Sequence, residues 1–128
     1  MSKYTEKTLK HLRDNNYVCW KVEYWNSFAR KRVDAFGFGD ILCTNNNKKE
    51  ISLIQTFSSA FAEHKRKILE DEKLSTYAKN WLTCNGAIYF IGWRKLRIKG
   101  KPKATEWKPR IEELKLIKDE LIFNRSEI

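Results

Sequence analysis

The sequence predicts an α/β or α+β domain, in which a small mixed sheet of about four to five strands is flanked by helices. Three observations lead to this fold class: apolar runs of strand length, intervening segments whose apolar residues recur on one helix face, and turn-forming residues at the boundaries. The 128 residues are 41% hydrophobic, enough for one buried core but too few for two full domains. We expect a single domain over residues 1–128, with a core over about 4–95 and a basic C-terminal extension over 96–128.

The N-terminal part of the chain predicts a helix, a strand and a basic loop. Tyr4 to Asn15 carries Leu9 and Leu12 among lysines and polar residues, as a short amphipathic helix does. Residues 17–25 alternate between two sets of side chains and are rich in β-branched and aromatic types, which favours a strand. The basic segment 26–35 is predicted to be a loop.

The next two strands are predicted to form a hairpin. One runs from about Ala35 to Thr44 and includes the stretch FGFGDIL, and the other runs from about Lys49 to Phe57. The residues between them, TNNNKK, tolerate positive φ and favour a turn. If the turn has even length and is centred on Asn47-Lys48, paired residue numbers sum to 95, so Leu42 faces Leu53.

Asp40 is the one carboxylate in the apolar stretch FGFGDIL. An ionised carboxylate in a packed sheet is costly unless it is paired, hydrogen-bonded or bound to a metal. The predicted register places Asp40 opposite Gln55, with Cβ atoms about 4.5 to 5.5 Å apart, so that both side-chain oxygens can bind one cation. Glu23, on the preceding strand, can add a second carboxylate. Oxygen ligands suit Mg²⁺ or Mn²⁺, and we predict a site for one of these ions.

The rest of the predicted core contains two helices and a strand. Ser58 or Ser59 can cap a helix that includes residues 60–70. A further helix over about Leu74 to Thr83 has its apolar residues on one face, and residues 87–93 form a continuous apolar run suited to a strand covered on both sides.

The C-terminal part of the chain has a weaker pattern. Residues 94–110 are very basic, and Pro109 limits any strand there to a sheet edge. The stretch ELKLIKDELIF, residues 113–123, favours either a strand end followed by a helix or a helix throughout.

Net charge favours a polyanionic partner. Lysine and arginine number 26 against 16 acidic residues, so the net charge is +10, and nucleic acid is expected ahead of an anionic membrane. No apolar run reaches about 18 residues, and the N-terminal residues lack a signal-peptide core. We expect a cytoplasmic protein, located in the host cytoplasm if its source is a phage.

Neither the cysteines nor the histidines predict a metal site. Cys19, Cys43 and Cys84 are odd in number, widely separated and flanked by apolar residues, as buried reduced thiols are. His11 and His64 are isolated in the sequence and are expected to be ordinary helix residues.

The predicted order of elements resembles that of a nuclease superfamily. A helix, a three-stranded meander, a helix and a strand, with an acid near the first helix or strand, Asp on the second strand and an acid or amide on the third, resembles the PD-(D/E)XK nucleases. The stretches VEYWN, DAFGFGDIL, LIQTFSS, KRKI and IGWRK are similar to those of small phage-encoded members. The resemblance covers about residues 4–95. It implies the restriction endonuclease-like αβββαβ core, Mg²⁺- or Mn²⁺-dependent hydrolysis of DNA phosphodiester bonds, and a homodimer if the chain follows the Holliday junction resolvases.

The resemblance also implies roles for particular residues. Asp40 matches the aspartate of the motif, and Gln55 matches the third-strand acid, which the family sometimes replaces with glutamine. Two positions after that acid the family usually has lysine, where this chain has Phe57. Some members supply the lysine from the following helix, so Lys67, or Lys65 as the second choice, would replace it.

Additional acids are assigned less directly. Glu23 is the first choice for the further metal ligand, and Glu6 on the first helix is the other candidate. Asp34 either contributes to the site or pairs with Arg32. In this interpretation Asp40 and Glu23 hold the metal, Gln55 orients it or its water, and a lysine positions the attacking water and stabilises the charged phosphorane.

Basic and aromatic residues are predicted to contact nucleic acid. The candidate cations are Arg30, Lys31, Arg32, Arg94, Lys95, Arg97, Lys99 and Lys101, and the candidate stacking residues are Trp93 and Trp107. Two alternatives to a nuclease remain open at this point: a nuclease-fold protein that binds nucleic acid without cleaving it, and a small RNA-binding module without a metal site.

Overall fold

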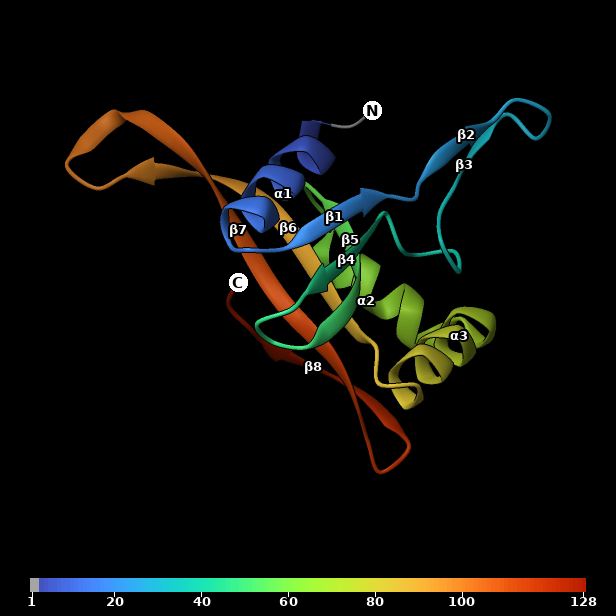
Figure 1. Ribbon diagram of the computed structural model, residues 1–128. Coiled ribbons are helices and arrows are strands. Elements are labelled where there is room, and N and C mark those ends of the chain that lie inside the picture. The colour runs from blue at the N-terminus through green and yellow to red at the C-terminus, as the bar shows by residue number, and fades with distance from the viewer. Residues whose placement is uncertain (1–2) are drawn as a thin grey trace.

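The computed structural model describes residues 3–128 and shows a mixed α+β fold, with three helices, a six-stranded mixed sheet and a separate two-stranded hairpin (Figure 1). The elements are α1 (Lys3–Asp14), β1 (Val18–Lys21), β2 (Tyr24–Asn26), β3 (Lys31–Val33), β4 (Ile41–Asn45), β5 (Glu50–Phe57), α2 (Phe61–Glu70), α3 (Glu72–Thr83), β6 (Ala87–Ile98), β7 (Lys101–Ile117) and β8 (Glu120–Arg125). The predicted α+β class with a mixed sheet flanked by helices is therefore confirmed, and the sheet has six strands instead of four or five.

The main sheet has the strand order β1-β4-β5-β6-β7-β8. Strands β1, β4 and β5 form an antiparallel meander, and β6 pairs with β5 in parallel after the chain crosses over through α2 and α3. Strands β7 and β8 then add two antiparallel hairpins. Because β5 and β6 run in the same direction, the C-terminal end of β5 and the middle of β6 lie at one end of the sheet.

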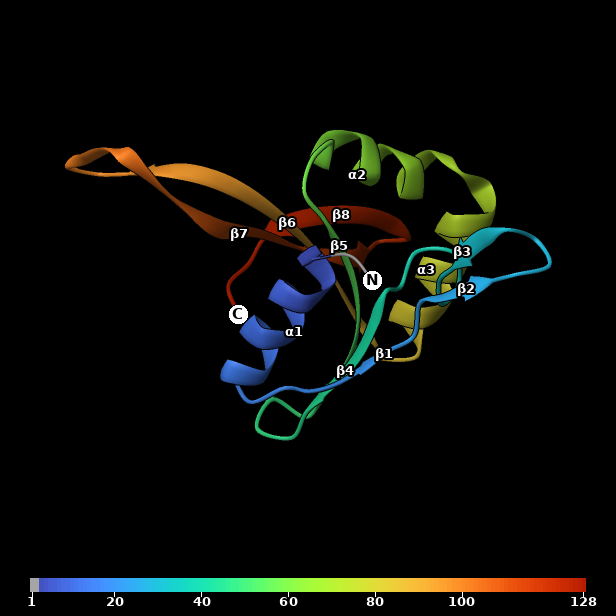
Figure 2. The ribbon, with the colours of Figure 1, turned by 90° about the horizontal axis from the view of Figure 1, so that it is seen from above.

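Helices cover both faces of this sheet. Leu9 and Leu12 of α1 pack with Ile54 and Ile91 in one core cluster. The residues next to these in the strands, such as Phe90, point the other way and pack with α2 and α3 in a second cluster. Figure 2 shows α1 and α2 on opposite sides of the sheet. The apolar run at the start of β6 is thus covered on both sides, as predicted.

The segment predicted as one strand over residues 17–25 is divided into two. Strand β1 ends at Lys21, and the N–H groups of Val22 and Glu23 donate to the Asp40 carbonyl at 3.0 and 3.3 Å. The chain then leaves the main sheet as β2. The predicted basic loop over 26–35 is wrong in part, because Lys31–Val33 pairs with β2 as strand β3.

The stretch FGFGDIL is mostly a loop, which corrects the predicted strand from Ala35. Ala35 and Gly39 form a β-bridge, and the chain reverses between them through Phe36 and Gly37, which have φ of 55° and 82°. A Cβ on Gly37 would lie 2.7 Å from the Leu74 side chain, so glycine fits this turn both in conformation and in space.

The predicted hairpin is present, and its register is confirmed. Strand β4 begins at Ile41, which pairs with Ile54, and Leu42 pairs with Leu53 as expected from the turn. Helix α2 differs from its prediction at the N-terminus. It begins after Ala60, which has φ of 58° and makes no side-chain cap, so neither predicted serine caps it. Helix α3 begins earlier than predicted and is capped by Asp71, which accepts from the Leu74 N–H at 3.0 Å.

The C-terminal region is a pair of β-hairpins, so the predicted helix within residues 113–123 is wrong. Lys118 and Asp119 both have positive φ, 50° and 67°, as the central residues of a two-residue hairpin turn do. Pro109 pairs with Trp93, where β7 has no neighbour on its other side, which agrees with the predicted edge position.

The cysteine prediction holds for two residues out of three. Cys19 and Cys43 are buried and free, whereas Cys84 is free and exposed at the end of α3. Within residues 3–128, the structure has no helix with the length and apolar character needed to cross a membrane.

Candidate metal centre

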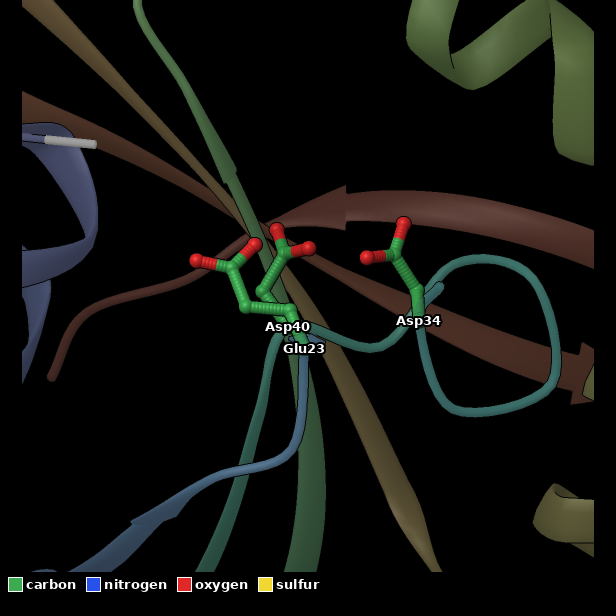
Figure 3. Close-up of side chains that lie close together, drawn as sticks. All are labelled: Glu23, Asp34 and Asp40. Atoms are coloured by element: carbon green, nitrogen blue, oxygen red, sulfur yellow. The ribbon is translucent and has the colours of Figure 1, made fainter. Parts of the chain in front are cut away.

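Three carboxylates from separate segments meet at one end of the sheet. Glu23 follows β1, Asp34 follows β3 and Asp40 precedes β4. One oxygen from each lies within 4.8 Å of the others. Figure 3 shows the Glu23 and Asp40 side chains together and Asp34 directed toward them from its loop.

The glycine-containing loop explains why Asp34 and Asp40 lie close together. The Ala35 N–H donates to the Gly39 carbonyl at 2.9 Å, and the Gly39 N–H donates back to the Ala35 carbonyl at 2.8 Å. Asp34 and Asp40 are the residues immediately outside this closed pair. In an antiparallel arrangement they are therefore directly opposed, as neighbours across two strands are.

Hydrogen bonds hold two of the three carboxylates in place. The Thr5 hydroxyl donates to Glu23 Oε1 at 3.1 Å, and the Thr56 N–H donates to Asp40 Oδ2 at 2.8 Å. Arg32 Nη1 lies 3.7 Å from Glu23 Oε2. Asp34 Oδ1 is buried and has no hydrogen-bond partner among residues 3–128. A buried oxygen with no partner, beside two fixed carboxylates, leaves a ligand position open toward the centre of the group.

The electrostatics of the group favour a bound cation. The pKa of Asp40 is raised to about 8, chiefly by burial; the Asp34 and Glu23 charges add to this shift, and the Thr56 N–H opposes it. Burial also raises the pKa of Asp34. Three ionised carboxylates at this spacing repel one another, and a divalent cation between them would remove that repulsion. The donors are all oxygens, a set suited to Mg²⁺ or Mn²⁺.

A cleft of about 680 Å³ adjoins the carboxylates. Asp34 and Gln55 line one part of it, and His64 and Lys67 of α2 line another. The remaining lining residues are Gly37, Glu63, Arg66, Glu70 and Asp71. Burial lowers the pKa of His64, and the Lys67 charge lowers it further. The ammonium group of Lys67 and the carboxylate of Asp34 therefore line the same cleft.

The structure brings together some of the residues predicted for the site. Asp40 and Glu23 are adjacent, as expected. Gln55 lines the cleft, but its amide Nε2 lies 3.2 Å from His64 Nδ1, and the third member of the carboxylate group is Asp34. From the sequence, Asp34 was expected either to contribute to the site or to pair with Arg32. In the structure Asp34 lies with Glu23 and Asp40, and Arg32 pairs with Glu23 instead.

The two candidate lysines have different surroundings. Lys67 lines the cleft and makes no ion pair within residues 3–128. Lys65 Nζ instead pairs with Glu112 Oε1 of β7 at 2.9 Å. Phe57, at the position where the superfamily that the sequence resembles usually has lysine, is buried in the core and stacks on the His64 ring with centroids 4.2 Å apart.

The predicted stacking residues are both covered. The Trp93 side chain is only 6% exposed, and its Nε1–H donates to the Thr8 hydroxyl at 2.7 Å. The Thr8 Oγ1 atom lies 2.6 Å from Thr56 Oγ1, so this chain of contacts ends at the residue whose N–H binds Asp40. Trp107 is partly buried and lies beneath the ammonium groups of Lys3 and Lys7. The Trp93 indole is therefore linked through Thr8 and Thr56 to the Asp40 carboxylate and helps to position this group.

Replacing Trp93 with Phe tests this supporting role. The variant removes the N–H donor to Thr8, and we expect a loss of about 1–2 kcal/mol in the free energy of unfolding, measured by urea denaturation. Trp107→Phe serves as the control, because the indole N–H of Trp107 makes no hydrogen bond within the described chain, and it should lose less than half as much. Equal losses in the two variants would contradict the role assigned to the Thr8 contact.

The predicted phosphate contacts lie on two projecting hairpins. Arg30, Lys31 and Arg32 are exposed at the tip and on the second strand of the β2–β3 hairpin, and Arg94 and Lys95 are exposed on the outer half of β6.

Comparisons with protein-family models, curated proteins and solved structures found no match to this chain.

Proposed function

We propose that the protein is a Mg²⁺- or Mn²⁺-dependent endonuclease that hydrolyses DNA phosphodiester bonds. The observation that carries the proposal is the convergence of Glu23, Asp34 and Asp40 beside a cleft that also holds Lys67. Acidic metal ligands next to a free ammonium group match the needs of phosphodiester hydrolysis, in which negative charge increases on the phosphate.

The arrangement of elements supports placing this site on a restriction endonuclease-like core. Helix α1 is followed by the antiparallel β1, β4 and β5 meander, by the helices α2 and α3, and by β6 parallel to β5. This order resembles the αβββαβ core of the PD-(D/E)XK nucleases, with β2–β3 inserted and β7–β8 appended. Asp40, at the start of the middle strand of the meander, is at the position that the resemblance assigns to its aspartate.

Each side chain has a distinct task in the proposed site. A divalent cation held by the carboxylates of Glu23, Asp34 and Asp40 would act as a Lewis acid toward the phosphate. Thr5 and the Thr56 N–H fix two of these carboxylates in orientation. Lys67 stabilises the charge that develops on the phosphate oxygens. The Gln55 side chain, held beside His64, provides polar contacts within the same cleft.

Cleavage assays test the proposal directly. Purified protein is incubated with supercoiled plasmid, single-stranded DNA, a four-way junction and structured RNA, in Mg²⁺, in Mn²⁺ and in EDTA. We expect metal-dependent DNA cleavage that Asp40→Ala and Asp34→Ala abolish. Asp14→Ala is the matched control, because Asp14 is exposed and, within residues 3–128, its side chain pairs with Lys10 alone, at 2.8 Å.

Other outcomes point to the alternatives. Cleavage that persists in Asp40→Ala or in EDTA would contradict a nuclease built on this metal centre. Binding of DNA without cleavage of any substrate would favour a nuclease fold used only for binding. Cleavage or binding restricted to RNA would contradict DNA as the substrate.

A further inference from the structure

Two basic hairpins project from the molecule on opposite sides of the candidate metal centre. Figures 1 and 2 both place the β2–β3 hairpin at one side and the outer part of β6–β7 at the other. The β2–β3 hairpin stands directly on the site, because Glu23 precedes its first residue and Asp34 follows its last. A ligand bound across the three carboxylates would therefore have one hairpin on each side.

The outer part of β6–β7, residues 94–108, which we name the basic arm, extends beyond the body of the sheet. Strand β5 ends at Phe57, level with Gly92, and β6 continues through Ile98, roughly 20 Å further at the usual rise per residue. The arm carries one acid, Glu106, which lies 3.3 Å from Lys108. Its cations are Arg94, Lys95, Arg97, Lys99, Lys101, Lys103 and Lys108. A projecting ribbon with this charge and little core is suited to a phosphate backbone.

The basic arm offers charge but no free aromatic ring. Its one aromatic residue, Trp107, is covered by Tyr4 edge-on and by the ammonium groups of Lys3 and Lys7 at 5.1 and 5.5 Å from the ring centroid. These contacts also place two α1 lysines beside the arm, so the basic surface continues from the arm toward the metal centre. Phosphate contacts alone carry no requirement for unpaired bases.

The β2–β3 hairpin has the opposite character, since it combines cations with exposed aromatic side chains. Tyr24 is 58% exposed, Trp25 is 64% exposed and Phe28, at the tip, is 100% exposed. Trp25 pairs directly with Arg32, so a cation and an aromatic ring share one face of the hairpin. Aromatic rings beside basic side chains form stacking platforms for unpaired bases.

The tip of this hairpin is ordered by its own hydrogen bonds. Asn26 Oδ1 accepts from the N–H groups of Phe28 at 3.0 Å and Ala29 at 3.1 Å. This arrangement shapes the turn and holds Phe28 away from the body. Because the backbone of the turn is already ordered, little backbone freedom is lost when a base stacks on the exposed Phe28 ring.

From this contrast we propose that the protein binds nucleic acid at a boundary between duplex and unpaired bases. The basic arm binds phosphates of the duplex, and Trp25 and Phe28 stack on unpaired bases on the other side of the carboxylates. The position of the cut bond rests on the proposed nuclease function. The binding mode is inferred from the two hairpins alone and does not depend on that function. An anionic membrane fits less well, because the basic arm carries charge but no exposed large apolar residue to insert between lipids.

Equilibrium binding in EDTA tests the inference separately from cleavage. Fluorescence anisotropy would compare a fully paired duplex, a forked duplex with two unpaired arms and the single strand, at several salt concentrations. We expect the fork to bind about tenfold more tightly than the duplex. The double variant Trp25→Ala/Phe28→Ala should bind the fork no more tightly than the duplex. Its affinity for the duplex should change by less than about twofold.

A charge variant tests the arm. Lys99→Gln/Lys101→Gln/Lys103→Gln should weaken binding to both DNAs and reduce the salt dependence of the affinity by up to about three units of slope. The matched control is Lys49→Gln/Lys115→Gln/Lys118→Gln, which removes equal charge at the opposite end of the sheet and should change the slope by less than about one unit.

Specific results would overturn the inference. Equal affinity for fork and duplex, an aromatic variant that keeps the fork preference, or Phe28-dependent attachment to phosphatidylserine vesicles without a fork preference would each do so. Metal-dependent cleavage without a fork preference would overturn this inference and leave the nuclease proposal standing. A fork preference without cleavage would overturn the nuclease proposal and leave this inference standing.

Discussion

Asp40→Asn is expected to make the metal-free protein more stable at neutral and mildly alkaline pH while abolishing cleavage. The Asp40 carboxyl is buried next to two other acids, and its pKa is raised to about 8. Asparagine has nearly the same shape and keeps an oxygen that can accept from the Thr56 N–H. The variant therefore retains the hydrogen bond and loses the buried charge.

The pH dependence has a definite sign. Because the pKa of Asp40 is higher in the folded protein than in the unfolded chain, the folded state binds more protons between about pH 4 and pH 8. Stability contributed by this group is complete at low pH and is lost as the pH rises through that range. The loss is on the order of 1 kcal/mol for each pH unit, and Asp40→Asn removes it. The pKa of His64 is lowered in the folded protein, so at pH values below the usual pKa of histidine this group makes stability rise with pH. This effect is the same in the wild type and in the variant.

Thermal unfolding from pH 5 to pH 8.5 measures this difference. In EDTA, the difference in Tm between variant and wild type should grow with pH in favour of the variant. Mn²⁺ should raise the Tm of the wild type, most strongly at high pH, and leave the variant unchanged, because a ligand stabilises only the state that binds it. Asp14→Asn, at an exposed ion pair, should shift stability by less than about 0.5 kcal/mol at every pH. A variant less stable than wild type at pH 8, or one that Mn²⁺ still stabilises fully, would contradict the metal centre.

The parts of the fold that could be predicted are those whose residues pack in the core. The β4–β5 register followed from the turn and from matching apolar faces, and the pairing of Leu42 with Leu53 confirms it. The run 87–93 identified a strand covered on both sides because burial on two faces leaves no polar alternation. In these segments local preference and tertiary packing agree.

The parts that could not be predicted depend on backbone conformation or lie outside the core. The basic arm buries few side chains, so hydrophobic periodicity carries no information about its strands. The turn at Lys118 and Asp119 has two residues with positive φ but no glycine, and the apolar residues on either side fit helical spacing as well as strand spacing.

The same distinction applies to the candidate site. Asp40 was predicted because a lone acid in an apolar run needs a partner, and Glu23 because the preceding strand places a second carboxylate nearby. Asp34 belongs with them only because the loop after it closes between Ala35 and Gly39, a local chain reversal that an extended-strand interpretation of FGFGDIL excludes. Two glycines within five residues were the available signal for that loop.

Lys67→Ala is expected to lower the cleavage rate by about 10²- to 10³-fold with little change in fold stability, as the loss of one charge-stabilising group does. Lys67 lines the cleft with Asp34 and makes no ion pair within residues 3–128 that the substitution would break. Lys67→Arg keeps a cation on the same helix position and should recover part of the rate. Single-turnover cleavage with saturating protein measures the chemical step apart from binding.

Lys65→Ala is the matched comparison, because the same side chain is removed two residues away on the same helix. Residues two positions apart do not share a helix face, and Lys65 is directed to Glu112 of β7 instead of the cleft. Its removal should leave cleavage within about threefold of wild type and cost roughly 1 kcal/mol of stability, since Glu112 keeps its contact with Arg110 at 2.7 Å. If Lys65→Ala were the slow variant and Lys67→Ala cleaved normally, the ammonium group in the cleft would have no part in the chemistry. If Lys67→Ala alone is slow, helix α2 supplies the cation that Phe57, buried in the core at the end of β5, cannot.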